Sequence, residues 1–171
     1  MKRHSAERTY AYETKTIHTA DRLDRTGLEV MRAIRDGELP MAAIAQTLDF
    51  SLVEVEHGMV AFAAEPQQFA YNMLGAMHGG WTATLLDSAM GCAVHSVMKP
   101  GFGYTTVDLT INYVRPVTTA TGTVRAEGKV LHAGRRIATA EGRLVSADGK
   151  LLAHGLTTCM IFSLEAGPLS P

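Results

Sequence analysis

The longest apolar stretch of the chain lies at residues 80–98 and has the pattern of a buried helix. It contains no proline, and Gly91 is the one glycine in its interior. A helix with almost no polar face is buried, and the apolar residues here surround nearly the whole helix: Trp81, Ala83, Leu85, Leu86, Ala89, Met90, Ala93, Val94 and Val97. Pro100 cannot continue a helix, so we predict that this one ends near Lys99.

After this helix, the apolar residues take up the period of two that is typical of a strand. The alternation is clearest at residues 104–114. The predicted strand has Val107, Leu109, Ile111 and Tyr113 on one face, and Thr106, Asp108, Thr110 and Asn112 on the other. Three more strands are predicted at 123–131, 136–145 and 151–162, and Asp148-Gly149 between the last two is a strong hairpin signal.

Before the central helix, residues 50–62 predict a hairpin with its turn at His57-Gly58. Two short helices are predicted upstream of it, at 28–34 and 41–45. The order of elements predicts an α+β fold in which an antiparallel sheet wraps around one helix. Because one helix covers only one face of a sheet, we expect a second copy of the chain to cover the other face or the edge.

These elements fit one domain. We predict a single domain at 27–163, an N-terminal extension at 1–26 that is partly flexible, and a flexible tail at 164–171. A chain of 171 residues is long enough for one complete hydrophobic core.

Composition and charge exclude several classes of protein. The net charge of −1 argues against a nucleic-acid binder, which would need an excess of Lys and Arg. No apolar run is long enough to span a bilayer, and none follows the charged start as in a secretion signal. Cys92 and Cys159 lie in apolar segments without metal-binding spacing, so we expect free buried thiols, no structural metal and a cytoplasmic location.

Asp87 is the most unusual residue of the central helix. It lies among Leu85, Leu86, Ala89 and Met90, where a carboxylate costs free energy unless it is paired or reaches a polar cavity. One interpretation is a catalytic group that accepts a proton. The other is a carboxylate that points out of the helix or pairs with a surface cation.

A second candidate is His78-Gly79-Gly80, directly before the helix. Free N–H groups at a helix N-terminus bind developing negative charge, and glycine lets a carbonyl oxygen approach closely. Gly79 could therefore donate to an oxyanion, although a tight turn would also need glycine. His78 fits either a general base or a structural cap. Asn72 and Thr106 could orient a water or a carbonyl, or could simply be satisfied loop and strand residues.

Residues 72–87 closely resemble the active-site signature of hotdog-fold thioesterases. The nearest group is the phenylacetic-acid-degradation (PaaI-like) branch of the 4-hydroxybenzoyl-CoA thioesterase family. The strand at 106–116 is similar to that group's next block, and 26–40 is similar to its bacterial members. The resemblance covers about residues 26–162.

The resemblance implies a hotdog fold whose subunits pair as dimers, often within homotetramers, with active sites that use both chains. It implies that Asp87 is the nucleophile or the general base and that Gly79 polarises the thioester carbonyl. Asn72 matches the amide that places the water or carbonyl, and Thr106 matches a hydroxyl that faces the acid.

The expected activity is hydrolysis of aryl or medium-chain acyl-CoA thioesters, with no cofactor because coenzyme A is part of the substrate. Arg135, Arg136 and Arg115 are candidates to bind its phosphates. Met73, Met77, Trp81 and Met90 suggest an adaptable apolar pocket. Two alternatives stay open: a dehydratase that pairs His78 with Asp87, and a non-catalytic acyl-CoA-binding regulator.

Overall fold

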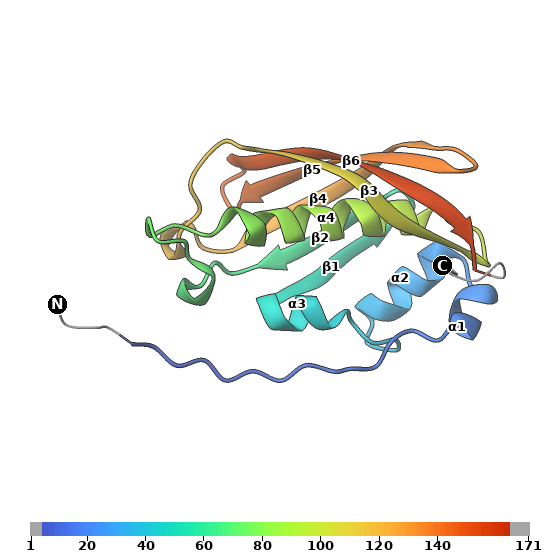
Figure 1. Cartoon of the computed structure of the whole chain (residues 1–171), viewed down its shortest axis with the longest axis horizontal. Helices are drawn as coiled ribbons and strands as arrows, with labels where there is room; N and C mark the ends of the chain where they lie inside the picture. The colour runs from blue at the N-terminus through green and yellow to red at the C-terminus, as the bar shows by residue number, and fades with distance from the viewer. Residues whose placement is uncertain (1–4, 165–171) are drawn as a thin grey trace.

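The computed structural model describes residues 5–164. The predicted tail at 164–171 therefore lies outside the described residues, apart from Leu164. A long helix, α4 (Gly79–Ser96), lies against one face of a six-stranded antiparallel sheet of order β1-β2-β4-β5-β6-β3 (Figure 1). The α+β architecture predicted from the sequence is confirmed. No helix of the described chain combines the length and the apolar character needed to cross a bilayer.

The buried helix lies where the sequence predicts it. Leu85, Leu86, Ala89, Met90, Ala93 and Val94 are completely buried between α4 and the sheet. Gly128 lets β4 (Val124–Ala133) approach the helix closely, since a Cβ at this position would lie 2.2 Å from the Ala89 carbonyl oxygen. The sheet can therefore curve around α4 at close range.

Five strands match their predictions within a few residues. β1 (Phe50–Glu56) and β2 (Met59–Ala64) form the first hairpin, and β4 joins that hairpin to β5 (Ile137–Ser146). β6 (Leu151–Ser163) follows the turn at Gly149, whose φ of 80° is a conformation that glycine adopts without strain.

The predicted faces of β3 (Phe102–Tyr113) are partly wrong. Thr106 pairs with Cys159 of β6, and Asp108 pairs with the next residue, Thr158, so Val107 is an extra residue in a β-bulge. A bulge shifts the alternation by one position. Thr106 therefore lies on the face that meets α4, and Val107 is 55% exposed, the reverse of the simple period-two prediction.

Three short helices cover the N-terminal side of the domain. α2 (Gly27–Arg35) begins at a capping box formed by Thr26 and Glu29, a strong helix start signal. α3 spans Ala43–Leu48, so the predicted helix at 41–45 was placed two residues too early. α1 (Thr19–Leu23) lies within a region whose sequence shows no helical pattern.

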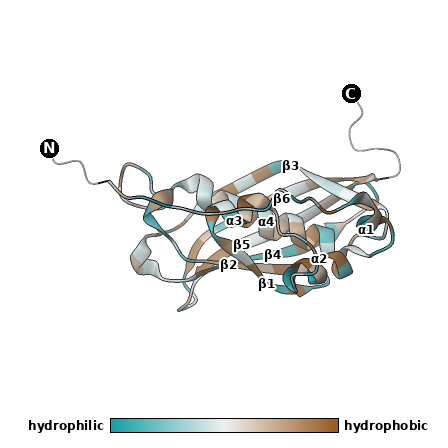
Figure 2. Ribbon diagram, turned by 90° about the horizontal axis from the view of Figure 1, so that it is seen from below, coloured by the Kyte–Doolittle hydropathy of each residue, from teal (hydrophilic) through white to brown (hydrophobic). Residues whose placement is uncertain are grey.

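The chain before α1 is extended and crosses the molecule beneath α3 and α2 (Figures 1 and 2). We call residues 5–18 the strap. The Arg8 guanidinium donates to the Thr47 carbonyl oxygen at 2.7 Å and lies 3.6 Å from the centre of the Phe69 ring. The Glu13 N–H donates to the Gln46 side-chain oxygen at 2.6 Å. The strap is thus held to α3 by specific contacts.

Candidate functional site

Asp87 lies at the middle of α4 with its carboxylate directed toward β3. Its Oδ1 accepts a hydrogen bond of 3.0 Å from the Thr106 hydroxyl. The side chain is half-buried, so it is neither enclosed in the core nor free at the surface. The Val107 bulge makes this contact possible, because it turns Thr106 toward the helix.

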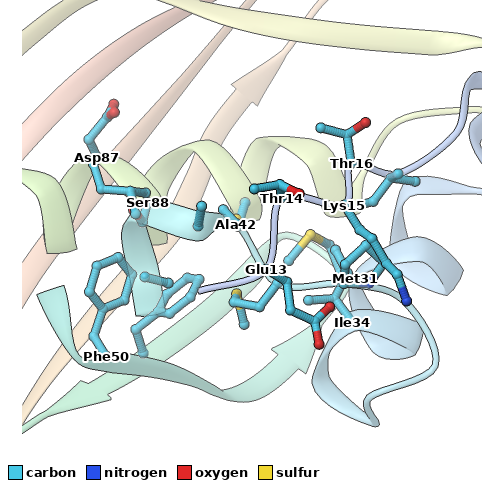
Figure 3. A pocket seen from close by; sticks show the side chains of 18 of the residues that line it. Glu13, Thr14, Lys15, Thr16, Met31, Ile34, Ala42, Phe50, Asp87 and Ser88 are labelled. Atoms are coloured by element: carbon cyan, nitrogen blue, oxygen red, sulfur yellow. The ribbon is translucent and has the colours of Figure 1, made fainter. Parts of the chain in front are cut away.

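Asp87 and Thr106 border a cavity of about 660 Å³ (Figure 3). Its walls come from all four α-helices and the first three strands, and strap residues 13–17 cover it. The apolar part of the lining includes Met31, Ile34, Phe50 and Phe62. A carboxylate at the edge of an apolar cavity is the arrangement expected for a site that binds an apolar substrate.

The sequence did not predict which residues form this cavity. Trp81 and Met90 pack in the core instead, and Met77 lines a smaller cavity at the start of α4. Met73 is 98% exposed. The sequence shows that apolar residues lie near the motif, but not which way their side chains point. That direction depends on the conformation of the loop, which no periodic pattern reveals.

The N-terminus of α4 is a second cluster of polar groups. His78 is the N-cap, and its Nδ1 accepts a hydrogen bond of 2.9 Å from the Gly80 N–H. The Tyr113 hydroxyl donates to the Gly79 carbonyl oxygen at 3.0 Å. Within the described residues the Gly79 N–H has no acceptor, so it remains available at the positive end of the helix dipole.

Asn72 organises the loop before this helix. Its side-chain oxygen accepts from the N–H groups of Leu74 and Ala76, at 2.8 and 3.3 Å. Asn72 and Gly79 line one cavity of about 350 Å³ together with Tyr113 and Arg115. The side-chain oxygen of Asn72 therefore holds this loop in place.

The five residues predicted as catalytic form two separate groups within one chain. Asn72, His78 and Gly79 surround the start of α4, whereas Asp87 and Thr106 lie two turns further along. Eight residues of α-helix span about 12 Å. One small substrate group therefore cannot contact both groups in a single chain.

The three predicted phosphate-binding arginines also lie apart. Arg115 belongs to the cavity at the start of α4, and its guanidinium donates to the Leu151 carbonyl oxygen at 2.5 Å. Arg135 lines a small cavity with Val97 and Phe102, near the end of α4. Arg135 and Arg136 are both exposed in the turn between β4 and β5.

The His78 cap predicts a measurable contribution to stability. Replacing His78 with alanine should lower the free energy of unfolding by about 1 kcal/mol, because the Gly80 N–H loses its acceptor. Urea unfolding at fixed protein concentration would measure this through the fluorescence of Trp81, the single tryptophan. His78→Asn should restore most of the loss, since asparagine is a good N-cap. An unchanged midpoint for the alanine variant would rule out the cap.

Comparisons with known proteins agree with this fold. A model of the thioesterase superfamily matches residues 74–153. A Halobacterium salinarum protein named "Putative esterase VNG_1336C" is 39% identical over 74 residues, which are 42% of this chain and 47% of that protein. The matched part thus spans about half the length of this curated relative.

Three solved structures are similar over most of their length. Conserved protein PA5202 from Pseudomonas aeruginosa is 31% identical, with a TM-score of 0.67 over 71% of this chain and 95% of that one. A Ralstonia eutropha protein titled "putative thioesterase, phenylacetic acid degradation-related protein" is 27% identical (TM-score 0.69; 76% and 98% covered). Protein smu.793 from Streptococcus mutans, bound to acetyl CoA, is 26% identical (TM-score 0.61; 67% and 89% covered).

The matched segment begins just before α4 and includes Asp87, the β3 bulge and the strands β3, β4 and β5. Sequence motif, fold and relatives therefore agree, and the chain belongs to the thioesterase superfamily, with the hotdog fold.

Proposed function

We propose that this protein hydrolyses acyl-CoA thioesters, with a site built from two copies of the chain. The observation that carries the proposal is the Asp87–Thr106 pair at the edge of an apolar cavity. The match to the thioesterase superfamily supports this substrate class, and so does the similarity to a protein whose structure holds acetyl CoA.

The free edge of β3 offers a way to bring the two groups together. β3 is the last strand of the sheet, and residues 107–110 at its middle are exposed. In an antiparallel pair with the β3 of a second copy, related by a two-fold axis through Thr110, the extra residue at Val107 would bring Thr106 opposite the other copy's Tyr113. Tyr113 contacts Gly79, and Thr106 contacts Asp87. Asp87 of one copy would then lie beside Gly79 of the other.

The chemistry follows from these groups. The Gly79 N–H and the helix dipole stabilise the negative charge that develops on the carbonyl oxygen. Asp87 accepts a proton from a water whose oxygen attacks the carbonyl carbon, or attacks that carbon itself to form an anhydride that water then hydrolyses. The C–S bond breaks and the thiolate of coenzyme A leaves. Asn72 would orient the water or the carbonyl.

The phosphates of coenzyme A need cations near the same site. Arg115 lies with Gly79, and two-fold pairing of β3 would bring the second copy's Arg135 and Arg136 to that side. We propose these three arginines as phosphate ligands, because one guanidinium group can donate two parallel hydrogen bonds to two oxygens of a phosphate. The acyl group would occupy the apolar cavity, which fits aryl or medium-length chains.

The assembly would extend beyond the dimer. The outer face of the sheet exposes Leu131, Ile137 and Leu156, by 54%, 44% and 54%. We propose that these apolar side chains pack in a homotetramer. The free thiols of Cys92 and Cys159 are consistent with a reducing compartment, so we propose a cytoplasmic location.

Subunit mixing tests both the activity and the shared site. Asp87→Asn and Gly79→Pro chains with different tags would be co-expressed, and assemblies that contain both chains purified through both tags. Each mixed pair of chains holds one intact site, so thiol release from a panel of aryl and aliphatic acyl-CoAs should reappear, at up to about half of the wild-type rate. Inactive mixed assemblies would place the site within one chain. An inactive wild type would refute hydrolysis of the acyl-CoAs tested.

Thr106 is a positioning residue in this proposal. Thr106→Val removes the hydroxyl that donates to Asp87 and should lower kcat about tenfold, with KM little changed. Thr106→Ser keeps the donor and should restore most of the rate. If both variants are equally impaired, the hydroxyl is not what holds Asp87.

The dehydratase alternative depends on His78 acting as a base. Its Nδ1 is already occupied as the acceptor for the Gly80 N–H, which favours the role of a helix cap. Retention of thiol release by His78→Ala would support hydrolysis without this residue. Loss of activity in a folded His78→Ala protein, with Asp87→Ala harmless, would favour the dehydratase.

A further inference from the structure

Arg22 borders the cavity that Asp87 opens into, although it belongs to a different part of the fold. It lies in α1, and its carbonyl oxygen accepts a hydrogen bond of 2.9 Å from the Gly101 N–H. This bond fixes α1 against the turn that follows α4. The Arg22 side chain lines the cavity together with Cys92 and Tyr104.

The guanidinium of Arg22 makes no hydrogen bond and no ion pair with any residue that the structure describes. Its Nε is buried and has no hydrogen-bond acceptor among residues 5–164. No described carboxylate lies within ion-pair distance of it, whereas Arg25 of the same segment pairs with Glu38 at 4.0 Å. A buried donor without an acceptor is costly, so an acceptor from a ligand would be strongly favoured here.

Three titratable side chains near this end of the cavity, His95, Cys92 and Tyr104, are neutral at physiological pH. Burial, and then the nearby charge of Arg22, lowers the pKa of His95 to about 4. Burial raises the pKa of the Cys92 thiol to about 12, and it raises the pKa of the Tyr104 phenol well above its ordinary value. None of these three groups supplies a negative charge that would balance Arg22.

Other charged groups of the cavity lie elsewhere along it. Asp87 precedes His95 by eight residues, or about 12 Å of helix. The exposed Glu13 is tied to α3 only through its N–H, which donates to the Gln46 side-chain oxygen, and its side chain points toward Ile34 of α2 (Figure 3). Lys15 on the strap is exposed, and its side chain points away from Asp87 (Figure 3). The cavity thus has the candidate nucleophile toward one end and an unpaired arginine toward the other, with Met31, Ile34 and Phe50 between.

We propose that Arg22 binds a carboxylate at the far end of the acyl group, so that the preferred substrates are CoA thioesters of dicarboxylic acids. This inference rests on the proposed thioesterase activity and specifies its substrate class. An arginine Nε and a neighbouring Nη match the two oxygens of a carboxylate. The apolar middle of the cavity would hold the methylene chain, and Asp87 would act on the thioester.

The test compares two substrates that differ only at the distal end: octanoyl-CoA, and the eight-carbon thioester that ends in a carboxylate. Wild type should show a kcat/KM about tenfold or more higher for the carboxylated substrate, because a site built for a polar group rejects an analogue that lacks it. Arg22→Gln should lose this preference, because its loss of kcat/KM should fall mainly on the carboxylated substrate. Arg25→Gln is the matched control, since it removes a charge nearby without touching the cavity.

The outcomes separate this inference from the proposed function. Hydrolysis of both substrates at equal efficiency, or equal losses for both in Arg22→Gln, would overturn the role of Arg22 and leave the thioesterase standing. If neither thioester is hydrolysed, the proposed thioesterase activity is refuted for these substrates. The change in melting temperature on adding the free eight-carbon monoacid or diacid would still test whether Arg22 binds a carboxylate. Stabilisation by the diacid alone, lost in Arg22→Gln, would support the anion site, and its absence would refute it.

Discussion

Replacing Asp87 with asparagine is expected to reduce thioester hydrolysis several hundred-fold or more, about 3–4 kcal/mol of lost transition-state stabilisation. Asparagine has nearly the same shape and can still accept the 3.0 Å hydrogen bond from Thr106. It carries no negative charge, so it can neither remove a proton from water nor attack the carbonyl carbon. Thiol release under steady-state conditions would measure the effect.

The neighbouring Ser88 provides a control for this variant. Ser88 lines the same cavity from the next position of α4, and Ser88→Ala should change the rate far less. The two variants should match wild type in oligomeric state and thermal stability. A folded Asp87→Asn protein with more than a tenth of wild-type kcat would exclude the carboxylate as nucleophile or base.

The second large effect is expected at Gly79, where a backbone group is the proposed donor. Gly79 is the first residue of α4 after the N-cap, a position where proline is tolerated. His78 has φ −62° and ψ 137°, which suits a residue before proline. Gly79→Pro therefore removes the N–H from a helix that can still form, and kcat should fall about 100- to 1000-fold.

Gly79→Ala is the matched control, because it adds a side chain but keeps the N–H. Its Cβ would lie 3.1 Å from the Tyr113 ring, which is 57% exposed and can move. We expect a much smaller loss of kcat for alanine than for proline. Equal losses would attribute the effect to crowding against Tyr113 and argue against an oxyanion donor.

Elements with a strong local pattern could be predicted from the sequence. The apolar character of residues 80–98 and the turn at Gly149 correspond to α4 and to the β5–β6 hairpin within a few residues. α3 was placed less accurately because its N-cap, Ala42, makes no capping hydrogen bond that would mark the start. The ends of a helix or strand can be predicted from local sequence only when a capping residue, a turn signal or a long periodic stretch marks them.

The candidate site was only partly predictable. Asp87 and the glycines at the start of α4 are recognisable because they lie in one short motif, yet the helix sets Gly79 and Asp87 about 12 Å apart. The contact between Thr106 and Asp87 depends on the bulge at Val107, which leaves no signal in an alternating sequence.

The strap and Arg22 could not be predicted from the sequence. The strap has no periodic pattern, and single contacts hold it, such as Arg8 with the Thr47 carbonyl oxygen. α1 is one turn long, too short for periodicity to reveal. Arg22 reaches the cavity because the chain folds back over α3 and α2. This is a long-range contact, which local sequence patterns do not encode.

The Val107 bulge also bears on aggregation. A regular, unpaired edge of twelve residues would accept almost any extended chain, as in the growth of fibrils. The extra residue bends β3 and interrupts the ladder of N–H and C=O groups near its middle. An added strand would lose hydrogen bonds at that point, so the edge is a poorer template than a regular one. One inserted residue thus protects the edge from indiscriminate strand addition.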